Sequence, residues 1–181
     1  MTPYSGLGAG IAVSSFARQK IDTTLIEIDP AVYNASRQYF GLPDLGTERV
    51  FIRDARAVVA EKRLTAVDKY DYVVHDCFSG GGAPAHLFTV EFWEDLKVIM
   101  NPDGVVAVVS RSTLHGRSYL VADFSPPLEN FAGKIDSHAA KATLFTLQRS
   151  FGQCRVLHDL PPDQFDLSHS SVNLVGSNVL N

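Results

Sequence analysis

The sequence predicts a doubly wound α/β domain with a mostly parallel sheet, and three observations lead to this prediction. Short apolar runs alternate along the chain with longer segments of helical composition. The glycine-rich segment 6–10 stands directly before the first helical segment. Glu27, Asp54 and Asp76 each follow a short apolar run. The carboxyl ends of parallel strands form the ligand-binding edge of such a sheet, which is where these acids would lie.

The first half of the chain supplies the alternating elements in order. Pro30 suits the first turn of a helix. The predicted helices are 11–20, 30–40 and 56–64, and the predicted strands are 23–28, 50–52 and 70–75.

The second half continues the same pattern. Thr89 can cap a helix whose apolar residues recur at helical spacing. Residues 101–104 read as a turn because they combine Asn, Pro, Asp and Gly. The remaining predictions are a buried strand over 105–109, a helix over 137–150 and late strands over 154–157 and 171–175.

Two segments depart from the pattern. Only Met1–Ser5 precedes the glycines, and Pro3 disfavours a central strand there, so the first strand is predicted to be truncated or missing. Residues 110–129 show no clear period and are predicted to form an irregular insertion. Apart from this insertion, residues 1–181 are predicted to form a single domain.

Composition narrows the function classes. The 181 residues are 45% hydrophobic and 20% charged, as in a soluble globular protein. The net charge of −4 and the lack of a basic stretch argue against a nucleic-acid partner. The sequence shows no signal peptide and no apolar run near the ~20 residues of a membrane span. Cys77 and Cys154 match no metal or redox spacing, so we expect no metal site and a cytoplasmic, reducing setting.

The glycines and the first two acids together predict an adenosine-binding site. Gly6, Gly8 and Gly10 would let the backbone approach a ligand. Glu27 would accept from both ribose hydroxyls, and Asp54 would accept from the adenine amino group. The spacing Gly-x-Gly-x-Gly differs from the dinucleotide pattern and favours an adenosyl ligand without a pyrophosphate.

Each site residue also has a purely structural interpretation. The glycines are equally consistent with a tight turn. Asp29 is better explained as a helix cap than as a ligand contact, and Asp54 has a capping alternative as well. Asp76 ends an apolar strand, where an unused carboxylate would be costly to desolvate. His75 should point to the opposite face of that strand and pack in the core.

Two further residues and a glycine run near Asp76 could belong to the same site. Cys77 has no basic neighbour in sequence and is expected to be a structural thiol. His86 is a weaker candidate for substrate contact. Gly80–Gly82 suit a loop over the site but precede no helix directly, so they do not indicate a phosphate cradle.

The motifs from Gly6 to Val109 resemble those of the catalytic domain of the spermidine and spermine synthases. These enzymes belong to the larger class with the S-adenosylmethionine-dependent methyltransferase fold. Among them, the chain resembles in particular the fungal synthase-like proteins that have a glycine-rich catalytic loop. The similar motifs, in order, are Gly-Leu-Gly-Ala-Gly at 6–10, Glu-Ile-Asp-Pro at 27–30, Asp-Ala at 54–55, Lys-Tyr-Asp at 69–71 leading to Asp76, Leu-Phe-Thr at 87–89 and Asn-Pro-Asp-Gly at 101–104. The resemblance implies that Ile28 and Ala55 join the binding residues and that Asp76 is catalytic.

The sequence also departs from that family. The synthases carry Asp-x-x-Asp-Pro in the catalytic loop, whereas Ser79 replaces the second aspartate here and Gly80 follows it. The synthases have a small N-terminal domain for which this sequence shows no counterpart. Conversely, the segment 110–129 of this sequence has no counterpart in the synthases. These differences weaken the case for polyamine transfer more than the case for adenosyl binding.

The sequence therefore leaves three functions open. The first is an aminopropyltransferase-like domain that binds S-adenosylmethionine or its decarboxylated form and modifies an amine or another small acceptor. The second is an S-adenosylmethionine-dependent methyltransferase, and the third is a catalytically silent binding or scaffold module. The resemblance is also compatible with a homodimer, and the chain itself contains no predicted membrane segment.

Overall fold

A seven-stranded sheet dominates the part of the chain that the computed structural model describes, which is residues 2–65, 69–77, 84–112, 116–123, 138–152 and 154–158. The strand order is β3-β2-β1-β4-β5-β6-β7. The strands are β1 (Thr2–Ser5), β2 (Thr23–Glu27), β3 (Val50–Ile52), β4 (Tyr70–His75), β5 (Met100–Ser112), β6 (Gly116–Asp123) and β7 (Arg155–His158). Strands β1 to β5 pair in parallel, whereas β6 is antiparallel to β5 and to β7. The predicted α/β class with a mostly parallel sheet is confirmed.

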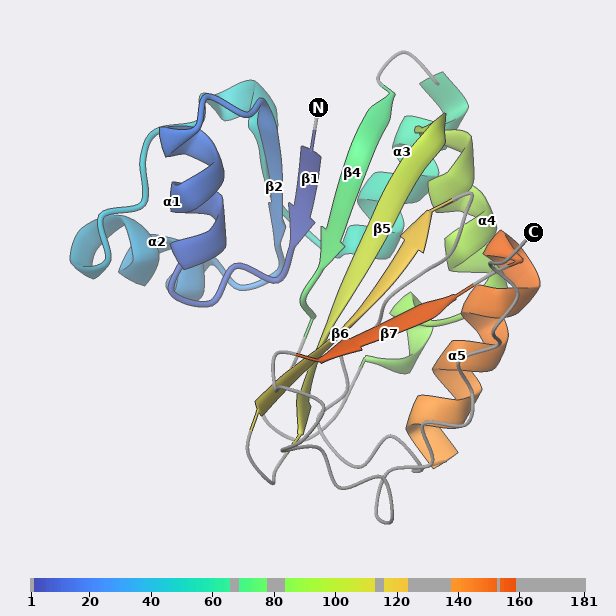
Figure 1. The fold of residues 1–181 in the computed structure, drawn as a ribbon. Helices are drawn as coiled ribbons and strands as arrows, with labels where there is room; N and C mark the ends of the chain where they lie inside the picture. The colour runs from blue at the N-terminus through green and yellow to red at the C-terminus, as the bar shows by residue number, and fades with distance from the viewer. Residues whose placement is uncertain are drawn as a thin grey trace.

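Helices cover both faces of this sheet (Figure 1). The helices are α1 (Ile11–Arg18), α2 (Pro30–Tyr39), α3 (Ala55–Thr65), α4 (Val90–Val98) and α5 (His138–Phe151), with short 3-10 turns η1 (Thr47–Arg49) and η2 (Ala85–Leu87). Helices α1 and α2 lie over one face, and α3, α4 and α5 lie on the opposite side. This arrangement is that of a doubly wound sheet.

The core is divided between the two faces. Leu25 and Val74 belong to the cluster under α1 and α2, whereas their strand neighbours Ile26 and Val73 belong to the larger cluster under α3, α4 and α5. This division follows from the period of two in a strand, which sends successive side chains to opposite faces. Trp93 is completely buried in the larger cluster.

Two helix starts follow the local sequence as predicted. The Asp29 carboxylate accepts from Ala31 N–H at 2.8 Å and caps α2, whose first residue is Pro30. The Thr89 hydroxyl accepts from Phe92 N–H at 3.3 Å and caps α4. In both cases the cap satisfies a backbone donor that has no partner within the helix.

The first strand, which was predicted to be truncated or missing, is present. β1 has four residues, and it pairs with β2 at all four positions. Its ladder with β4 involves only Tyr4 and Ser5, so Pro3 lies outside that ladder. The expectation that Pro3 disfavours a central strand was therefore wrong. A proline is tolerated in a strand where its missing N–H is not needed by a neighbouring strand.

Two predictions in the second half need correction. The predicted turn at 101–104 lies inside β5, in an irregular stretch between the pairs Tyr70–Met100 and Tyr72–Val105. The predicted irregular insertion at 110–129 contains the end of β5 and all of β6, which pair with each other. Neither the turn residues nor this segment shows a clear alternation of apolar and polar side chains, so the pairing with neighbouring strands decides the structure. The predicted strand over 171–175 lies outside the described residues.

Candidate functional site

Three carboxylates come together at one edge of the sheet. Glu27 ends β2, Asp54 follows β3 and Asp76 follows β4, and these strands run in the same direction. Burial raises the pKa of the neighbouring Cys77 thiol to about 12, and the charges of all three carboxylates add to that rise. The acids selected from the sequence therefore share one neighbourhood.

Glu27 is a buried carboxylate with a fixed orientation. The residue is only 8% exposed to solvent. Oε2 accepts from Leu7 N–H at 2.8 Å, and Oε1 accepts from Asp29 N–H at 2.9 Å. Each carboxylate oxygen can accept two hydrogen bonds, so each keeps one acceptor position after these contacts. Glu27 thus holds the glycine loop and presents two oriented oxygen atoms.

The glycine loop packs directly against the end of β4. Gly6 has φ +90°, and a Cβ atom there would lie 1.9 Å from the carbonyl oxygen of Asp76. Gly8 has φ +53°, but nothing lies within 4 Å of the position of its Cβ. Gly6 is therefore needed for the close approach of two chain segments, whereas Gly8 borders open space that a ligand could enter.

Two contacts from α2 and the loop after it support the glycine loop. The Ser36 hydroxyl, on α2, donates to the Gly8 carbonyl at 2.6 Å. Gly10, the N-cap of α1 with φ +75°, packs against the Leu42 side chain. Ser36 was not among the predicted site residues, and no local signal identifies it, because its partner lies 28 residues away.

The two residues added by the family resemblance lie in different surroundings. Ile28 directly follows Glu27 in the chain and is 66% exposed, so its apolar side chain is open to solvent. Ala55 is buried in the core cluster under α3, so only its backbone remains to contact a ligand.

Asp54 has the capping role that the sequence left open. Its Oδ1 accepts from Arg56 N–H at 2.9 Å at the start of α3. The same oxygen lies 3.3 Å from Nε2 of His86, which belongs to η2. The structure therefore brings His86 to the predicted adenine-binding carboxylate.

Asp76 is held at the end of β4 by its backbone. Its N–H donates to the Ser5 carbonyl at 2.7 Å, which ties it to the end of β1. Ser79 and Gly80–Gly82, which were predicted to lie in the loop after Asp76, are outside the described residues.

His75 is a core residue, as predicted. It is 1% exposed, and burial lowers its pKa to about 3. The rings of Phe88, Phe92 and Trp93 surround it at centroid distances of 5.0 to 5.5 Å. An uncharged imidazole packed among aromatic rings is consistent with a core role. Cys77, with its raised pKa, remains a thiol and is a poor nucleophile.

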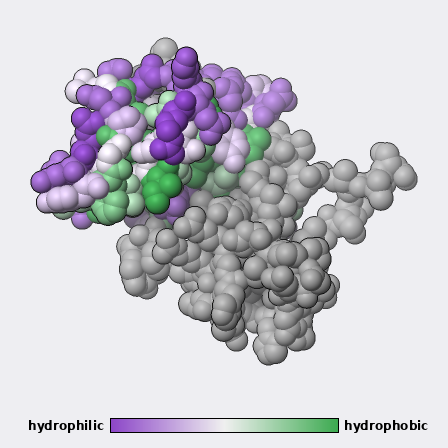
Figure 2. Space-filling model, turned by 60° about the vertical axis from the view of Figure 1, so that its left-hand side comes forward, coloured by the Kyte–Doolittle hydropathy of each residue, from purple (hydrophilic) through white to green (hydrophobic). Residues whose placement is uncertain are grey.

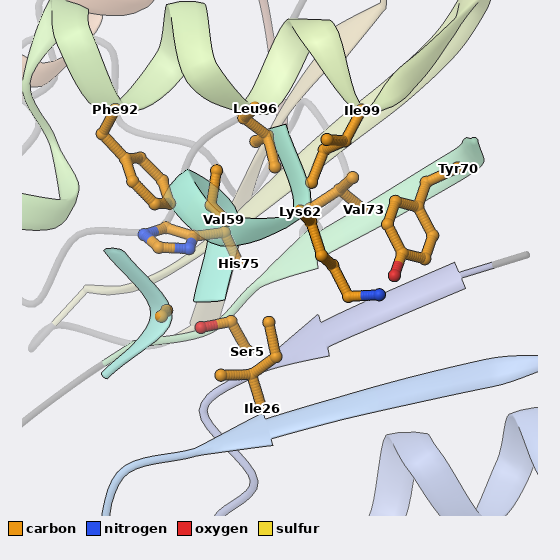
Figure 3. A pocket seen from close by; sticks show the side chains of 11 residues that line it. Ser5, Ile26, Val59, Lys62, Tyr70, Val73, His75, Phe92, Leu96 and Ile99 are labelled. Carbon is orange, nitrogen blue, oxygen red and sulfur yellow. The ribbon is translucent and has the colours of Figure 1, made fainter. Parts of the chain in front are cut away.

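A cavity lies beneath the carboxyl edge, between the sheet and helices α3 and α4 (Figure 3). Its walls are mainly apolar side chains such as Val59, Leu96 and Ile99, with His75 and Tyr70 along β4. None of the three carboxylates at the edge of the sheet lines this cavity, so it belongs to the core and not to the carboxylate site.

The surface over α1 and α2 is mainly hydrophilic, with a smaller group of apolar residues near its lower edge (Figure 2). Within the described part of the chain, no group of three His, Cys, Asp or Glu side chains could hold a metal ion. Among those same residues, no helix combines the length and the apolar character needed to cross a membrane.

Comparison with known proteins identifies one family and two kinds of relative. The profile of the family described as the spermine/spermidine synthase domain matches residues 10–131. An N-terminal histidine N-methyltransferase of Emericella nidulans is 36% identical over 155 residues, which cover 85% of this chain and 24% of that protein. A polyamine aminopropyltransferase of Vibrio vulnificus is 33% identical over 110 residues, which cover 60% of this chain and 36% of that protein. The chain therefore spans about a quarter to a third of the length of these curated relatives.

Solved structures share the fold at lower identity. Human methyltransferase-like protein 13 in complex with SAH has a TM-score of 0.53 and 19% identity, covering 92% of this chain and 86% of that one. A probable spermidine synthase from Corynebacterium glutamicum has a TM-score of 0.53 and 21% identity, covering 87% of this chain and 66% of that one. These likenesses support the methyltransferase-type fold.

Proposed function

The chain belongs to the spermine/spermidine synthase domain family, and from this membership we propose that it is a transferase domain that binds an adenosyl sulfonium compound. The observation that carries the proposal is the geometry of Glu27, whose two oxygens are oriented by backbone N–H groups from the glycine loop and from Asp29. Two fixed acceptors side by side suit the two adjacent hydroxyls of a ribose.

The other contacts extend along the same edge of the sheet. Asp54 accepts the adenine amino group, and Ile28 covers an apolar face of the nucleoside. Gly8 supports this placement, because open space lies where its side chain would be. Asp76 then stands beyond the ribose, where the sulfonium and the acceptor meet.

We infer that the reaction is methyl transfer from S-adenosylmethionine to a nitrogen. Two observations favour it over aminopropyl transfer. Ser79 stands where the synthases have their second catalytic aspartate. The methyltransferase relative aligns over 155 residues, whereas the aminopropyltransferase of Vibrio vulnificus aligns over 110. The name of that relative makes an N-terminal histidine a candidate acceptor.

The chemistry asks little covalent help from the protein. The acceptor nitrogen attacks the methyl carbon with its lone pair, the carbon–sulfur bond breaks, and the sulfur leaves as a neutral thioether. The domain must align nitrogen, carbon and sulfur and exclude water. The methylated nitrogen must lose a proton, and the Asp76 carboxylate is the group proposed to accept it.

Aminopropyl transfer remains the second candidate, because the family profile and the Vibrio vulnificus relative both favour it. It would use decarboxylated S-adenosylmethionine and a small amine. The site residues would keep the same roles, since both cofactors carry the same adenosyl group.

Calorimetric titration separates these functions. The chain is titrated with S-adenosylmethionine, its decarboxylated form, methylthioadenosine and NAD, and then incubated with a peptide that begins with histidine. We expect binding of the adenosyl compounds, no binding of NAD and a mass increase of one methyl group on the peptide. Binding without any transfer would favour a silent module, and binding of NAD alone would refute the proposal.

A further inference from the structure

Two segments far apart in sequence meet at the Asp54 carboxylate. Arg56 N–H donates to Oδ1 from the start of α3, and His86 Nε2 lies 3.3 Å from the same oxygen. The side chains of Asp54 and His86 are 41% and 48% exposed. The pair therefore stands at the surface of the candidate site and not in the core.

Arg56 holds the backbone of η2 in this position. Its Nη1 donates to the His86 carbonyl at 3.0 Å and to the Thr89 hydroxyl at 3.0 Å. The Thr89 hydroxyl in turn caps α4. One guanidinium therefore connects the start of α3 to η2 and to the start of α4, which fixes the point from which the His86 ring reaches Asp54.

The fold itself does not require this ring. The turn η2 is closed by backbone hydrogen bonds, from Leu87 N–H to Pro84 O at 2.9 Å and from Phe88 N–H to Ala85 O at 3.1 Å. A half-exposed contact between His and Asp contributes little to stability. The arrangement is better explained by what it does to the carboxylate, since His86 and Arg56 together occupy Oδ1 and leave Oδ2 to the ligand.

We propose that His86 determines specificity for the purine, an inference that rests on the proposed function. With Oδ1 occupied, Asp54 offers Oδ2 as an acceptor in a fixed orientation. An adenine amino group donates to that oxygen. A purine with an oxo group at position 6 brings an acceptor against it. Both carboxylate oxygens are acceptors, so only a displacement of the whole Asp54 side chain would relieve the repulsion, and the two contacts at Oδ1 oppose that displacement. His86 acts through Asp54 and is a positioning residue.

The test compares S-adenosylhomocysteine with its inosine counterpart by calorimetry. In the unmodified chain the adenosine compound should bind much more tightly. His86→Ala frees the carboxylate, so affinity for the adenosine compound should fall about three- to tenfold and the preference over inosine should shrink. His86→Gln keeps an N–H donor and should restore much of the preference, which a merely structural loss would not do.

Arg63→Ala is the matched control. Arg63 also lies on α3 and pairs with Asp95 at 2.8 Å, but it belongs to the last turn of the helix, at the end opposite to Asp54. Its removal should leave both affinities unchanged. If the unmodified chain prefers adenosine and His86→Ala keeps the same preference, the inference about His86 is wrong while the proposed function stands. If the unmodified chain binds neither compound, the proposed function fails.

Discussion

Replacing Glu27 by Gln tests the residue on which the candidate site depends most. The substitution keeps the size of the side chain but replaces one acceptor oxygen with an NH₂ group. Glu27 accepts from two backbone donors, Leu7 N–H at 2.8 Å and Asp29 N–H at 2.9 Å, and it is nearly buried. One of these donors would face another donor and lose its partner.

The magnitude follows from those two hydrogen bonds. A hydrogen bond to a charged group contributes about 1.5–3 kcal/mol, a neutral one about 0.5–1.5 kcal/mol, and a buried donor left without a partner costs about 1–3 kcal/mol. Glu27→Gln weakens one bond and removes the other, so the free energy of unfolding should fall by about 2–4 kcal/mol. The same change removes one acceptor for the ribose, and affinity for S-adenosylmethionine should fall about ten- to a hundredfold.

Urea unfolding of the free chain and calorimetry on the folded fraction measure the two losses separately. Ser36→Ala serves as a control, because it removes a support of the glycine loop without touching the carboxylate. It should reduce stability while leaving most of the affinity. A Glu27→Gln chain with unchanged stability and unchanged affinity would refute the reasoning, and loss of stability alone would restrict Glu27 to a structural role.

Three further predictions concern the glycine loop, the core and the reaction. Gly6→Ala should prevent folding, because its Cβ would meet the Asp76 carbonyl at 1.9 Å, and circular dichroism would show the loss of structure. Gly8→Ala should lower the free energy of unfolding by about 1–2 kcal/mol and weaken ligand binding, which calorimetry would measure. Burial lowers the pKa of His75 from 6.5 to about 3, so the unfolded chain binds one more proton in that range. The free energy of unfolding should therefore fall as pH drops below 6.5, by up to about 1.4 kcal/mol per pH unit, and His75→Phe should flatten this slope in urea unfolding. With decarboxylated S-adenosylmethionine and putrescine, little or no spermidine should form. Ser79 is neutral and cannot replace the ionised second aspartate of the synthases, and the loss of such a partner costs about 3–5 kcal/mol in a desolvated site. Rapid formation of spermidine would contradict this prediction.

Much of the fold was predictable because its signals are local. The boundaries of β3 and β4 match the predicted strands, and Asp29 and Thr89 cap the helices that they were expected to cap. A cap, a proline at a helix start or a run of β-branched residues acts within a few positions of itself. The order of these elements then predicted the parallel sheet and the edge at which Glu27 and the other two acids lie.

Other features could not be predicted because their partners are distant in sequence. Pro3 is accommodated because β1 begins its ladder with β4 only at Tyr4. The strand β6 forms against β5, although its own sequence shows no clear alternation. In each case the hydrogen-bonding partner, and not the local propensity, decides the structure.

The sequence by itself thus determined the class of fold, the glycine loop and the acids that follow the strands. Only the tertiary structure decided how they are held. Ser36 reaches Gly8 across 28 residues, and His86 reaches Asp54 across 32 residues. Hydrogen bonds of this kind depend on side-chain positions that packing fixes after the sheet and the helices have come together, so no pattern along the chain encodes them separately.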